Sequence, residues 1–434
     1  MRFYSTKNKS KFYSLRDAVL QSMPEDRGLF MPESIPVLPE GFFRNIAGLN
    51  FQDIAYAIAK QFLAGDLPDS EIDRISREAV NFPVPLVRVT EGIYSLELFH
   101  GPTLAFKDVG ARFMSRLMSY LNRGENQKLT ILVATSGDTG SAVAHGFYNV
   151  DGIEVIILYP SGKVSMLQEK QLTTLGGNIS AVEVDGTFDD CQRLVKDAFL
   201  DSDLKSAYRL CSANSINIAR LIPQSFYYVE AYRQLEDRSL PLYFSVPSGN
   251  FGNLCAGLIA SRMGLPVSKF IAANNQNDSV CRYLSSGEFN PMPTAQTISN
   301  AMDVGLPSNF ERMMDLYGAS HISMKNEIAG FSYDDIQTRQ AMKQVYKQDG
   351  YVLDPHGAVA WLGLQDFLRQ FSGQSNAVFL ETAHPAKFID VVEETLQFQL
   401  QIPDSLEKLK NKEKRAFLMQ PDFLLFKDFL NSRI

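Results

Sequence analysis

The sequence predicts an α/β fold built on parallel sheets. Three short apolar runs, at residues 129–134, 154–159 and 179–184, are each followed by a stretch of helical character. Strands that are apolar on both sides are typical of parallel sheets covered by helices on both faces. The chain has 434 residues, which is more than one ordinary hydrophobic core, so two or three domains are expected.

Residues 1–90 are predicted to form a helical N-terminal region. Ser14 is placed to cap a helix, and residues 51–59 carry apolar side chains at helical spacing. Residues 24–32, which are bounded by prolines, predict a turn. No catalytic chemistry is visible in this region, so its expected role is packing, with a part in covering a cleft.

The same alternation of strands and helices continues to about residue 400. Further strands are predicted at residues 242–246, 270–273 and 377–380. Helices are predicted at residues 141–147, 166–175, 189–199 and 254–263. The tail beyond residue 400 is charged and is expected to be helical, with the basic run 408–415 as a solvated helix face.

The composition is that of a globular protein and argues against several functional classes. The formal net charge of −7 argues against nucleic acid as a partner. The N-terminus lacks the apolar core of a signal peptide, and no apolar run is long enough to cross a membrane. The four cysteines include no C-x-x-C pair, so neither disulfides nor structural zinc is expected. We therefore expect a cytoplasmic enzyme without a metal.

Lys107 is the first residue with a chemical signature. It follows a Gly-Pro turn and lies among the apolar residues Phe99, Leu104 and Phe106. Desolvation penalises the ammonium form of a buried lysine, and a neutral amine can attack an aldehyde to form a Schiff base, the link that pyridoxal phosphate uses. A surface lysine at the start of a helix would explain the same residue, so the loops elsewhere in the chain have to decide.

The glycine-rich loop at residues 248–253 follows a predicted strand and precedes a helix. Ligands of open α/β sheets bind beyond the carboxyl ends of the strands. Backbone N–H groups at a helix N-terminus converge on one point and favour an anion, so this loop has the features of a phosphate cup. No Gly-Lys-Ser/Thr sequence follows it, which argues against a nucleotide triphosphate.

Two more loops after strands are rich in hydrogen-bond donors. The loop 135–141 offers several hydroxyls and suits a carboxylate or a phosphate ester, although ordinary helix capping would also explain it. In the loop 212–220, Arg220 could present a planar fork to an oxyanion beside Asn214 and Ser215. A helix cap followed by a surface arginine is the plain alternative for this loop.

The loop 381–388 follows the last predicted strand. Thr382 could donate to or accept from a ring nitrogen at the strand end. His384, which precedes Pro385, is expected to be structural.

Together these stretches resemble the threonine synthases, a family of fold-type II pyridoxal phosphate enzymes. The resemblance runs collinearly from the turn at 24–32 to about residue 400. It is most specific in His-Gly-Pro-Thr-Leu-Ala-Phe-Lys-Asp (100–108) and in Thr-Ala-His-Pro-Ala-Lys-Phe (382–388). It implies two parallel-rich α/β domains with a helical N-terminal domain. The implied bounds are an N-terminal domain at 1–90, a catalytic core at 91–400 with a smaller subdomain at about 105–235 inserted in it, and a helical tail at 401–434.

The resemblance also implies roles for individual residues. Lys107 would be the Schiff-base lysine, and Thr382 would be the partner of the pyridine nitrogen. The phosphate cup of the cofactor would be Gly249, Asn250, Phe251, Gly252 and Asn253. The substrate carboxylate would face Ser136, Gly137, Asp138 and Thr139, and the substrate phosphate would be held by Asn214, Ser215 and Arg220.

Asp138 departs from the pattern of many type II relatives, which have an asparagine there facing the 3′-oxygen of the cofactor. A carboxylate beside that phenolate would repel it unless a proton is shared between them. His100, Thr103 and Asp108 are expected to hold the turn before Lys107 rather than touch a ligand.

The reaction implied by the resemblance converts O-phospho-L-homoserine and water into L-threonine and phosphate. A monomer or homodimer is expected, without activation by a metabolite. Two alternatives stay open at this point: another type II lyase or synthase, such as a threonine dehydratase, and a non-catalytic relative that binds pyridoxal phosphate or phosphate.

Overall fold

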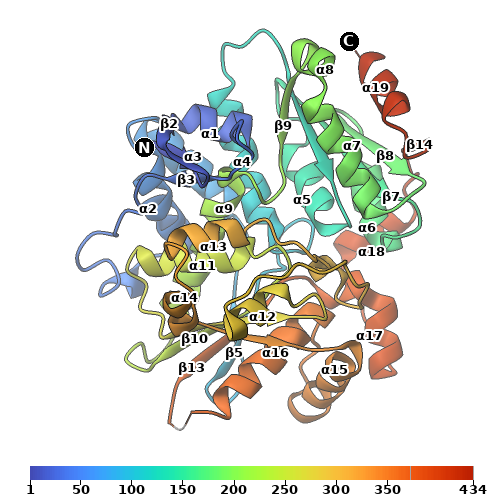
Figure 1. Ribbon diagram of the computed structural model, residues 1–434. Helices are drawn as coiled ribbons and strands as arrows, with labels where there is room; N and C mark the ends of the chain where they lie inside the picture. Colours follow the sequence, from blue (N-terminus) through green and yellow to red (C-terminus); the bar gives the residue numbers. More distant parts are fainter. Residues whose placement is uncertain (372, 434) are drawn as a thin grey trace.

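The computed structural model describes residues 1–371 and 373–433. It contains two α/β regions, each built around one sheet that is flanked by helices (Figure 1). The larger sheet has six strands in the order β12-β11-β10-β13-β5-β4. Neighbouring strands are parallel except for β4 and β5, which are antiparallel. The strands of this sheet are β4 (Leu86–Thr90), β5 (Ile93–Glu97), β10 (Leu242–Pro247), β11 (Lys269–Asn274), β12 (Ile328–Ser332) and β13 (Asn376–Glu381).

The smaller sheet has five parallel strands in the order β14-β8-β7-β6-β9. Four of them lie between β5 and β10 in the chain, and the fifth comes from the C-terminal tail. In Figure 1 this sheet occupies the upper right, above the larger sheet. Its strands are β6 (Leu129–Ala134), β7 (Ile153–Pro160), β8 (Ile179–Val184), β9 (Arg209–Ser212) and β14 (Phe417–Met419).

Helices cover both faces of both sheets, which explains why the strands are apolar on both sides. In β13, Phe379 packs on Trp361 of α16, whereas Val378 and Leu380 belong to the core on the opposite face. The helices and 3-10 helices from α4 to α10 are α4 (Lys107–Leu121), α5 (Asp138–Phe147), α6 (Met166–Thr173), α7 (Phe188–Leu200), α8 (Ser202–Ala207), α9 (Ile218–Leu221), η2 (Ile222–Gln224) and α10 (Ser225–Gln234). Those from α11 to α17 are α11 (Gly252–Arg262), α12 (Ser279–Ser286), η3 (Asn300–Met302), α13 (Phe310–Leu316), α14 (His321–Glu327), α15 (Asp335–Asp349), α16 (Pro355–Leu368), η4 (Pro385–Phe388) and α17 (Ile389–Leu396).

The predicted α/β core is confirmed closely. The predicted strands 129–134 and 179–184 coincide with β6 and β8, and the other predicted strands agree with the structure within one residue at each end. Two helices begin two or three residues earlier than predicted: α5 starts at Asp138 instead of residue 141, and α11 starts at Gly252 instead of residue 254. Asp138, Thr139, Gly252 and Asn253 therefore lie in the first turn of a helix, where N–H groups are unpaired and the helix dipole favours an anion.

The N-terminal region contains helices, as predicted, and also a three-stranded antiparallel sheet that was not predicted. Ser14 caps the first helix by accepting from the N–H of Asp17. The third strand falls inside the stretch expected to be only a turn, because it pairs with the first strand in a contact between distant residues. The elements are β1 (Phe3–Ser5), β2 (Asn8–Tyr13), α1 (Leu15–Gln21), β3 (Phe30–Pro32), η1 (Ile46–Gly48), α2 (Phe51–Leu63) and α3 (Asp69–Ala79).

The C-terminal tail contains the helices α18 (Asp404–Lys410) and α19 (Phe423–Asn431), with the strand β14 between them. The interpretation of residues 408–415 as one solvated helix face is wrong. The helix ends at Lys410, and Lys414 reaches back to form ion pairs with Glu169 at 2.6 Å and Glu183 at 2.7 Å. The tail thereby completes the smaller sheet. No helix of the described residues is long and apolar enough to span a membrane.

Candidate active site

Lys107 is the first residue of α4 and lies beside the loop that follows β13. Phe106 N–H donates to the carbonyl of Thr382 at 2.8 Å, and His384 N–H donates to the carbonyl of Leu104 at 3.0 Å. Two loops far apart in the sequence are thus held side by side by backbone hydrogen bonds. This contact brings Lys107 and Thr382 together at the carboxyl end of the larger sheet, where α/β proteins bind their ligands.

The environment of Lys107 favours a neutral amine. Burial, opposed by the carboxylate of Asp138 and aided by the nearby cations Arg220 and Lys387, lowers the pKa of Lys107 from its ordinary value to about 8. The amine is therefore a much better nucleophile and base at neutral pH than an exposed lysine.

Thr103 and Asp108 hold the turn that presents Lys107. The carboxylate of Asp108 accepts from the N–H of Thr103 at 2.9 Å and from its hydroxyl at 2.6 Å. Both side chains are buried and engaged with each other. His100 contacts Glu97 at 2.7 Å, away from this pair. These contacts support the expectation that the three residues shape the turn.

The loop between β10 and α11 has the form of an anion cup. Phe251 has a left-handed backbone conformation with φ of 59°, which turns the chain into the helix. None of the five backbone N–H groups of residues 249–253 donates a hydrogen bond to another described residue. Unpaired N–H groups at a helix N-terminus form a site for a phosphate. The cup is held in place because Asn253 Nδ2 donates to the carbonyl of Pro247 at 2.7 Å.

In the loop between β6 and α5, some polar groups stabilise the loop itself and others are accessible to a ligand. The hydroxyl of Thr135 accepts from the N–H groups of Gly137 at 3.0 Å and Gly140 at 2.8 Å, so these groups stabilise the loop itself. The hydroxyls of Ser136 and Thr139 lie on the more accessible part of the same loop. These two hydroxyls are the ones free to meet a ligand.

Asp138, at the start of α5, is buried and ionised. Its carboxylate pairs with Lys387 Nζ at 2.7 Å and accepts from Gln168 Nε2 at 2.9 Å. Burial alone would raise the pKa of Asp138, but the charges of Lys387 and Lys107 and these hydrogen bonds bring it well below its ordinary value. A carboxylate in this state accepts hydrogen bonds and donates none.

Arg220, on α9, is a buried cation with an unused donor. One of its Nη atoms donates to the carbonyl of Ala213, while Nε has no partner among the described residues. Burial lowers the pKa of Arg220 to about 10, which leaves it charged at neutral pH. The side-chain oxygen of Asn214, in the preceding loop, is also buried without a partner. A buried guanidinium with a free N–H fits an anion as its ligand.

The anion cup adjoins the loop of Arg220. Asn250 Nδ2 in the cup donates to Ser215 Oγ in that loop at 2.6 Å. Arg312, which is fully buried, fixes the same loop by donating to the carbonyls of Ser215 at 3.1 Å and Ile216 at 2.6 Å. Two donor-rich sites therefore lie side by side, and their donors suit two phosphate groups.

Lys387 and Gln168 belong to the site but were not among the residues predicted for it. Lys387 lies in the quoted motif at 382–388, but a lysine in a loop shows no sign in the sequence of being fully buried. Its carboxylate partner, Asp138, lies far from it in the sequence. A signal would have been the buried charge of Asp138, which requires a cation near it.

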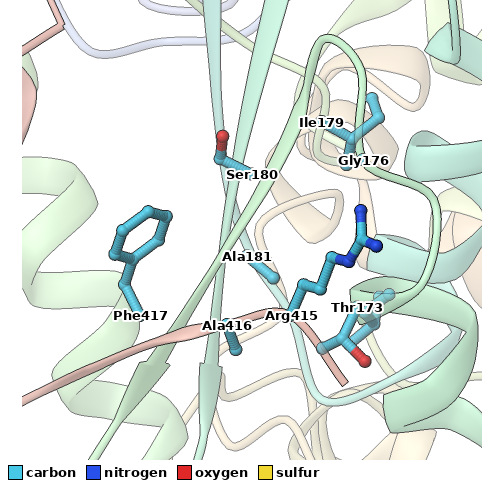
Figure 2. Close-up of a pocket in the computed structure, with 9 residues that line it drawn as sticks. Thr173, Gly176, Ile179, Ser180, Ala181, Arg415, Ala416 and Phe417 are labelled. Carbon is cyan, nitrogen blue, oxygen red and sulfur yellow. The ribbon is translucent and has the colours of Figure 1, made fainter. Parts of the chain in front are cut away.

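A separate cavity of about 240 Å³ lies between α6, β8 and the tail (Figure 2). Figure 2 shows Arg415 reaching from the tail toward Gly176, with Phe417 on the other side of the strand. None of the candidate site residues lines this cavity. The cation in its wall, Arg415, is exposed to solvent, so we assign the cavity no ligand.

Comparisons with known proteins bear on the whole chain. Three family descriptions match consecutive parts of it: "Threonine synthase N terminus" at residues 2–80, "Pyridoxal-phosphate dependent enzyme" at 81–383 and "Threonine synthase, C-terminal" at 358–430. The threonine synthase of Haemophilus influenzae is 44% identical over 431 residues, which is 99% of each chain.

Solved structures match to the same extent. The crystal structure of threonine synthase from Escherichia coli superposes with a TM-score of 0.93 and 42% identity, and the match covers 100% of both chains. The PLP-bound threonine synthase from Brucella melitensis gives a TM-score of 0.93 with 34% identity, covering 100% of this chain and 99% of that one.

Proposed function

Because the chain belongs to the threonine synthase family of pyridoxal-phosphate-dependent enzymes, we propose that it converts O-phospho-L-homoserine and water into L-threonine and phosphate. The observation that carries this proposal is the contact between two anion sites, Asn250 to Ser215 at 2.6 Å. The reaction needs two phosphates bound close together, one on the cofactor and one on the substrate. A threonine dehydratase needs only the first of them.

Lys107 and Thr382 are assigned to the two ends of the cofactor ring. The amine of Lys107 would hold the cofactor through its aldehyde carbon, and the hydroxyl of Thr382 would hold the ring nitrogen. Pyridoxal phosphate supplies an electron sink for the charge that develops at the substrate Cα. The cofactor phosphate is assigned to the cup of Gly249, Asn250, Phe251, Gly252 and Asn253.

Lys107 also moves the protons of the reaction. Its amine would take the Cα proton of the substrate and then a Cβ proton, since its pKa of about 8 lies close to the working pH. Phosphate leaves Cγ with the electron pair of the C–O bond. The two protons taken by Lys107 are returned to Cγ and Cα, and water adds its hydroxyl to Cβ while its remaining proton goes to the departed phosphate. Arg220 stabilises the charge of the leaving phosphate.

The substrate is assigned to the two loops described above. The phosphate is held by Asn214, Ser215 and Arg220. The carboxylate meets the hydroxyls of Ser136 and Thr139, while Gly137 shapes the loop and Asp138 contributes through its backbone N–H, since its side chain is occupied by Lys387.

The domain division follows from the same proposal. We assign residues 1–90 to an N-terminal domain, 91–400 to the catalytic core with the subdomain 105–235 inserted in it, and 401–434 to the tail. The four consecutive strands β6 to β9 support the insertion, since they pair only with one another and with β14. We propose that the enzyme acts in the cytoplasm as a monomer or homodimer, with neither nucleic acid nor a membrane as a partner.

The proposal is tested by incubating the full-length protein with pyridoxal phosphate and O-phospho-L-homoserine. Phosphate and L-threonine are expected in equal amounts, measured by a phosphate assay and by chromatography. A 2-oxo acid with ammonia as products would indicate a dehydratase instead. Cofactor binding without any product would indicate a non-catalytic relative.

The rate at which the apoprotein captures pyridoxal phosphate is expected to depend on the pKa of Lys107. Only the neutral amine reacts, and a pKa of about 8 leaves roughly one amine in ten neutral at pH 7. The rate should therefore rise about fivefold between pH 7 and pH 8 and level off above pH 9. Stopped-flow absorbance at the visible–ultraviolet border measures it. A rate that keeps rising tenfold per unit to pH 10 would contradict the lowered pKa.

Gly249→Ala is expected to weaken cofactor binding by roughly tenfold or more, because the cup would have to move. A Cβ at Gly249 would lie 2.6 Å from Met302 Cα, which is a steric clash. Because the clash is with a backbone atom, a change of side-chain rotamer cannot relieve it. Fluorescence titration with pyridoxal phosphate measures the dissociation constant. Gly48→Ala is the control, because a Cβ there meets nothing within 4 Å, and this variant should bind the cofactor normally. Gly65 is equally open but has a positive φ, so alanine there would be strained.

A further inference from the structure

Lys387 is a buried ammonium group with one unused hydrogen-bond donor. Its Nζ donates to Asp138 Oδ1 at 2.7 Å and to the carbonyl of Thr103 at 2.8 Å. The side chain is fully buried, and that of Asp138 is 3% exposed. An ammonium has three N–H donors, so two are used and the third has no partner among the described residues. A buried donor of this kind calls for a ligand.

Lys387, which carries the unused donor, lies near Lys107. Lys387 is close enough to Lys107 for its charge to lower the pKa of Lys107, and the carboxylate of Asp138 interacts with both lysines. The three side chains therefore lie close together beyond the carboxyl ends of the strands. Whatever Lys107 holds covalently is also a neighbour of Lys387.

The chemistry of pyridoxal phosphate identifies the group that needs this donor. Its aldehyde carbon, to which Lys107 attaches, is bonded to the ring atom next to the one that carries the 3′-oxygen. That oxygen is a phenolate when ionised and is stabilised by a hydrogen-bond donor, above all by a charged one. Asp138 cannot fill this role, because its ionised carboxylate has no hydrogen to donate.

We propose that Lys387, held in place by Asp138, Gln168 and the carbonyl of Thr103, donates the hydrogen bond to the 3′-oxygen of the cofactor. This inference rests on the proposed assignment of Lys107 as the residue that binds the cofactor. It gives Asp138 a positioning role: the carboxylate anchors the ammonium and balances its charge. It also resolves the repulsion expected between a carboxylate and a phenolate, since the ammonium stands between them.

Lys387→Met tests the donor by removing the charge while keeping the length of the side chain. The dissociation constant for pyridoxal phosphate should rise roughly tenfold to hundredfold, which is the range for a hydrogen bond to a charged group. The pH midpoint of the cofactor absorbance change should move upward by about one unit, because the cation that favours the deprotonated cofactor is gone. Both readouts are taken on the full-length protein without substrate.

A second pair of variants separates the donor role from simple charge balance. Lys387→Met leaves the carboxylate of Asp138 buried and unpaired, so the apoprotein should melt about 5 °C lower or more. Adding Asp138→Asn or Asp138→Ala to Lys387→Met removes that charge, and each double variant should regain the melting temperature. Only the asparagine can donate to the 3′-oxygen, so only Lys387→Met/Asp138→Asn should also regain the cofactor affinity and the pH midpoint.

Two outcomes would overturn the inference. One is a cofactor affinity within twofold of the parent in Lys387→Met. The other is equal recovery of affinity and pH midpoint in the two double variants, which would reduce Lys387 to a counter-ion of Asp138. Failure of the proposed function gives a different result: the parent would bind the cofactor, and the Lys387 effects would persist, but no phosphate would be released from O-phospho-L-homoserine.

Discussion

Lys107→Ala is expected to abolish the absorbance band of the bound cofactor at the visible–ultraviolet border and to stop the release of phosphate. On the proposed assignment of Lys107, the variant loses both the covalent attachment of the cofactor and the base that takes the Cα proton. Loss of the proton transfer alone lowers the rate by on the order of 10²–10⁴-fold. Absorbance spectra of the loaded protein and a phosphate assay measure the two effects. The fold should survive, because the change removes an amine whose desolvation opposes its charge.

Lys196→Ala is the matched control, since Lys196 is exposed on the surface of α7. This variant should keep the absorbance band and the rate of the parent. A Lys107→Ala protein that retained the band would mean that another amine holds the cofactor. Lys387 would then be the first candidate, because it is the other buried lysine of the site.

Arg220→Ala is expected to lower kcat/KM for O-phospho-L-homoserine by on the order of 10²–10³-fold. The guanidinium is the buried cation of the second anion site, and its Nε has no partner among the described residues. On the proposed assignment of Arg220, the change removes the group that binds the substrate phosphate and stabilises it as it leaves. Cofactor affinity should change little, because the cup at residues 249–253 is intact. Steady-state kinetics and a cofactor titration measure the two quantities.

Arg220→Lys separates charge from geometry at the same position. Lysine keeps the positive charge but lacks the planar fork that binds a phosphate in two places, so its activity should fall between those of the parent and Arg220→Ala. Turnover of O-phospho-L-homoserine by Arg220→Ala with an unaltered KM would contradict the substrate assignment. A type II enzyme without a second phosphate site would then be the better description.

The α/β core could be predicted because its signals are local. Strands such as β6 and β8 are mostly apolar and almost wholly buried, so short apolar runs mark them in the sequence. The serine cap at Ser14 is equally local, since it concerns residues three apart. The N-terminal sheet and β14 could not be predicted in this way. The strand β2 is largely exposed and rich in lysine, and the three residues of β14 form a strand only because β8 offers them an edge.

The same distinction between local signals and contacts of distant residues applies to the candidate site. Loops 135–141 and 248–253 are recognisable because glycines and hydroxyls between a strand and a helix have a chemical meaning of their own. The extension of α5 and α11 by two or three residues into these loops was missed, since helix ends carry weak sequence signals. Lys387 was missed for a stronger reason: it lies in the specific motif 382–388, but the residues around it do not show that its ammonium group is buried against Asp138.

The sequence by itself determined the α/β class and the positions of most core strands, because apolar runs, turns and glycine-rich loops are local signals. Its assignment of Lys107 as the reactive amine came from the family resemblance and stays a prediction. Only the tertiary structure decided which charges meet. It brought Lys387 to Asp138 and Asn250 to Ser215, and it left Arg220 buried with a free donor. Electrostatic interactions of buried groups depend on distance and desolvation, and the packing of the whole chain sets both.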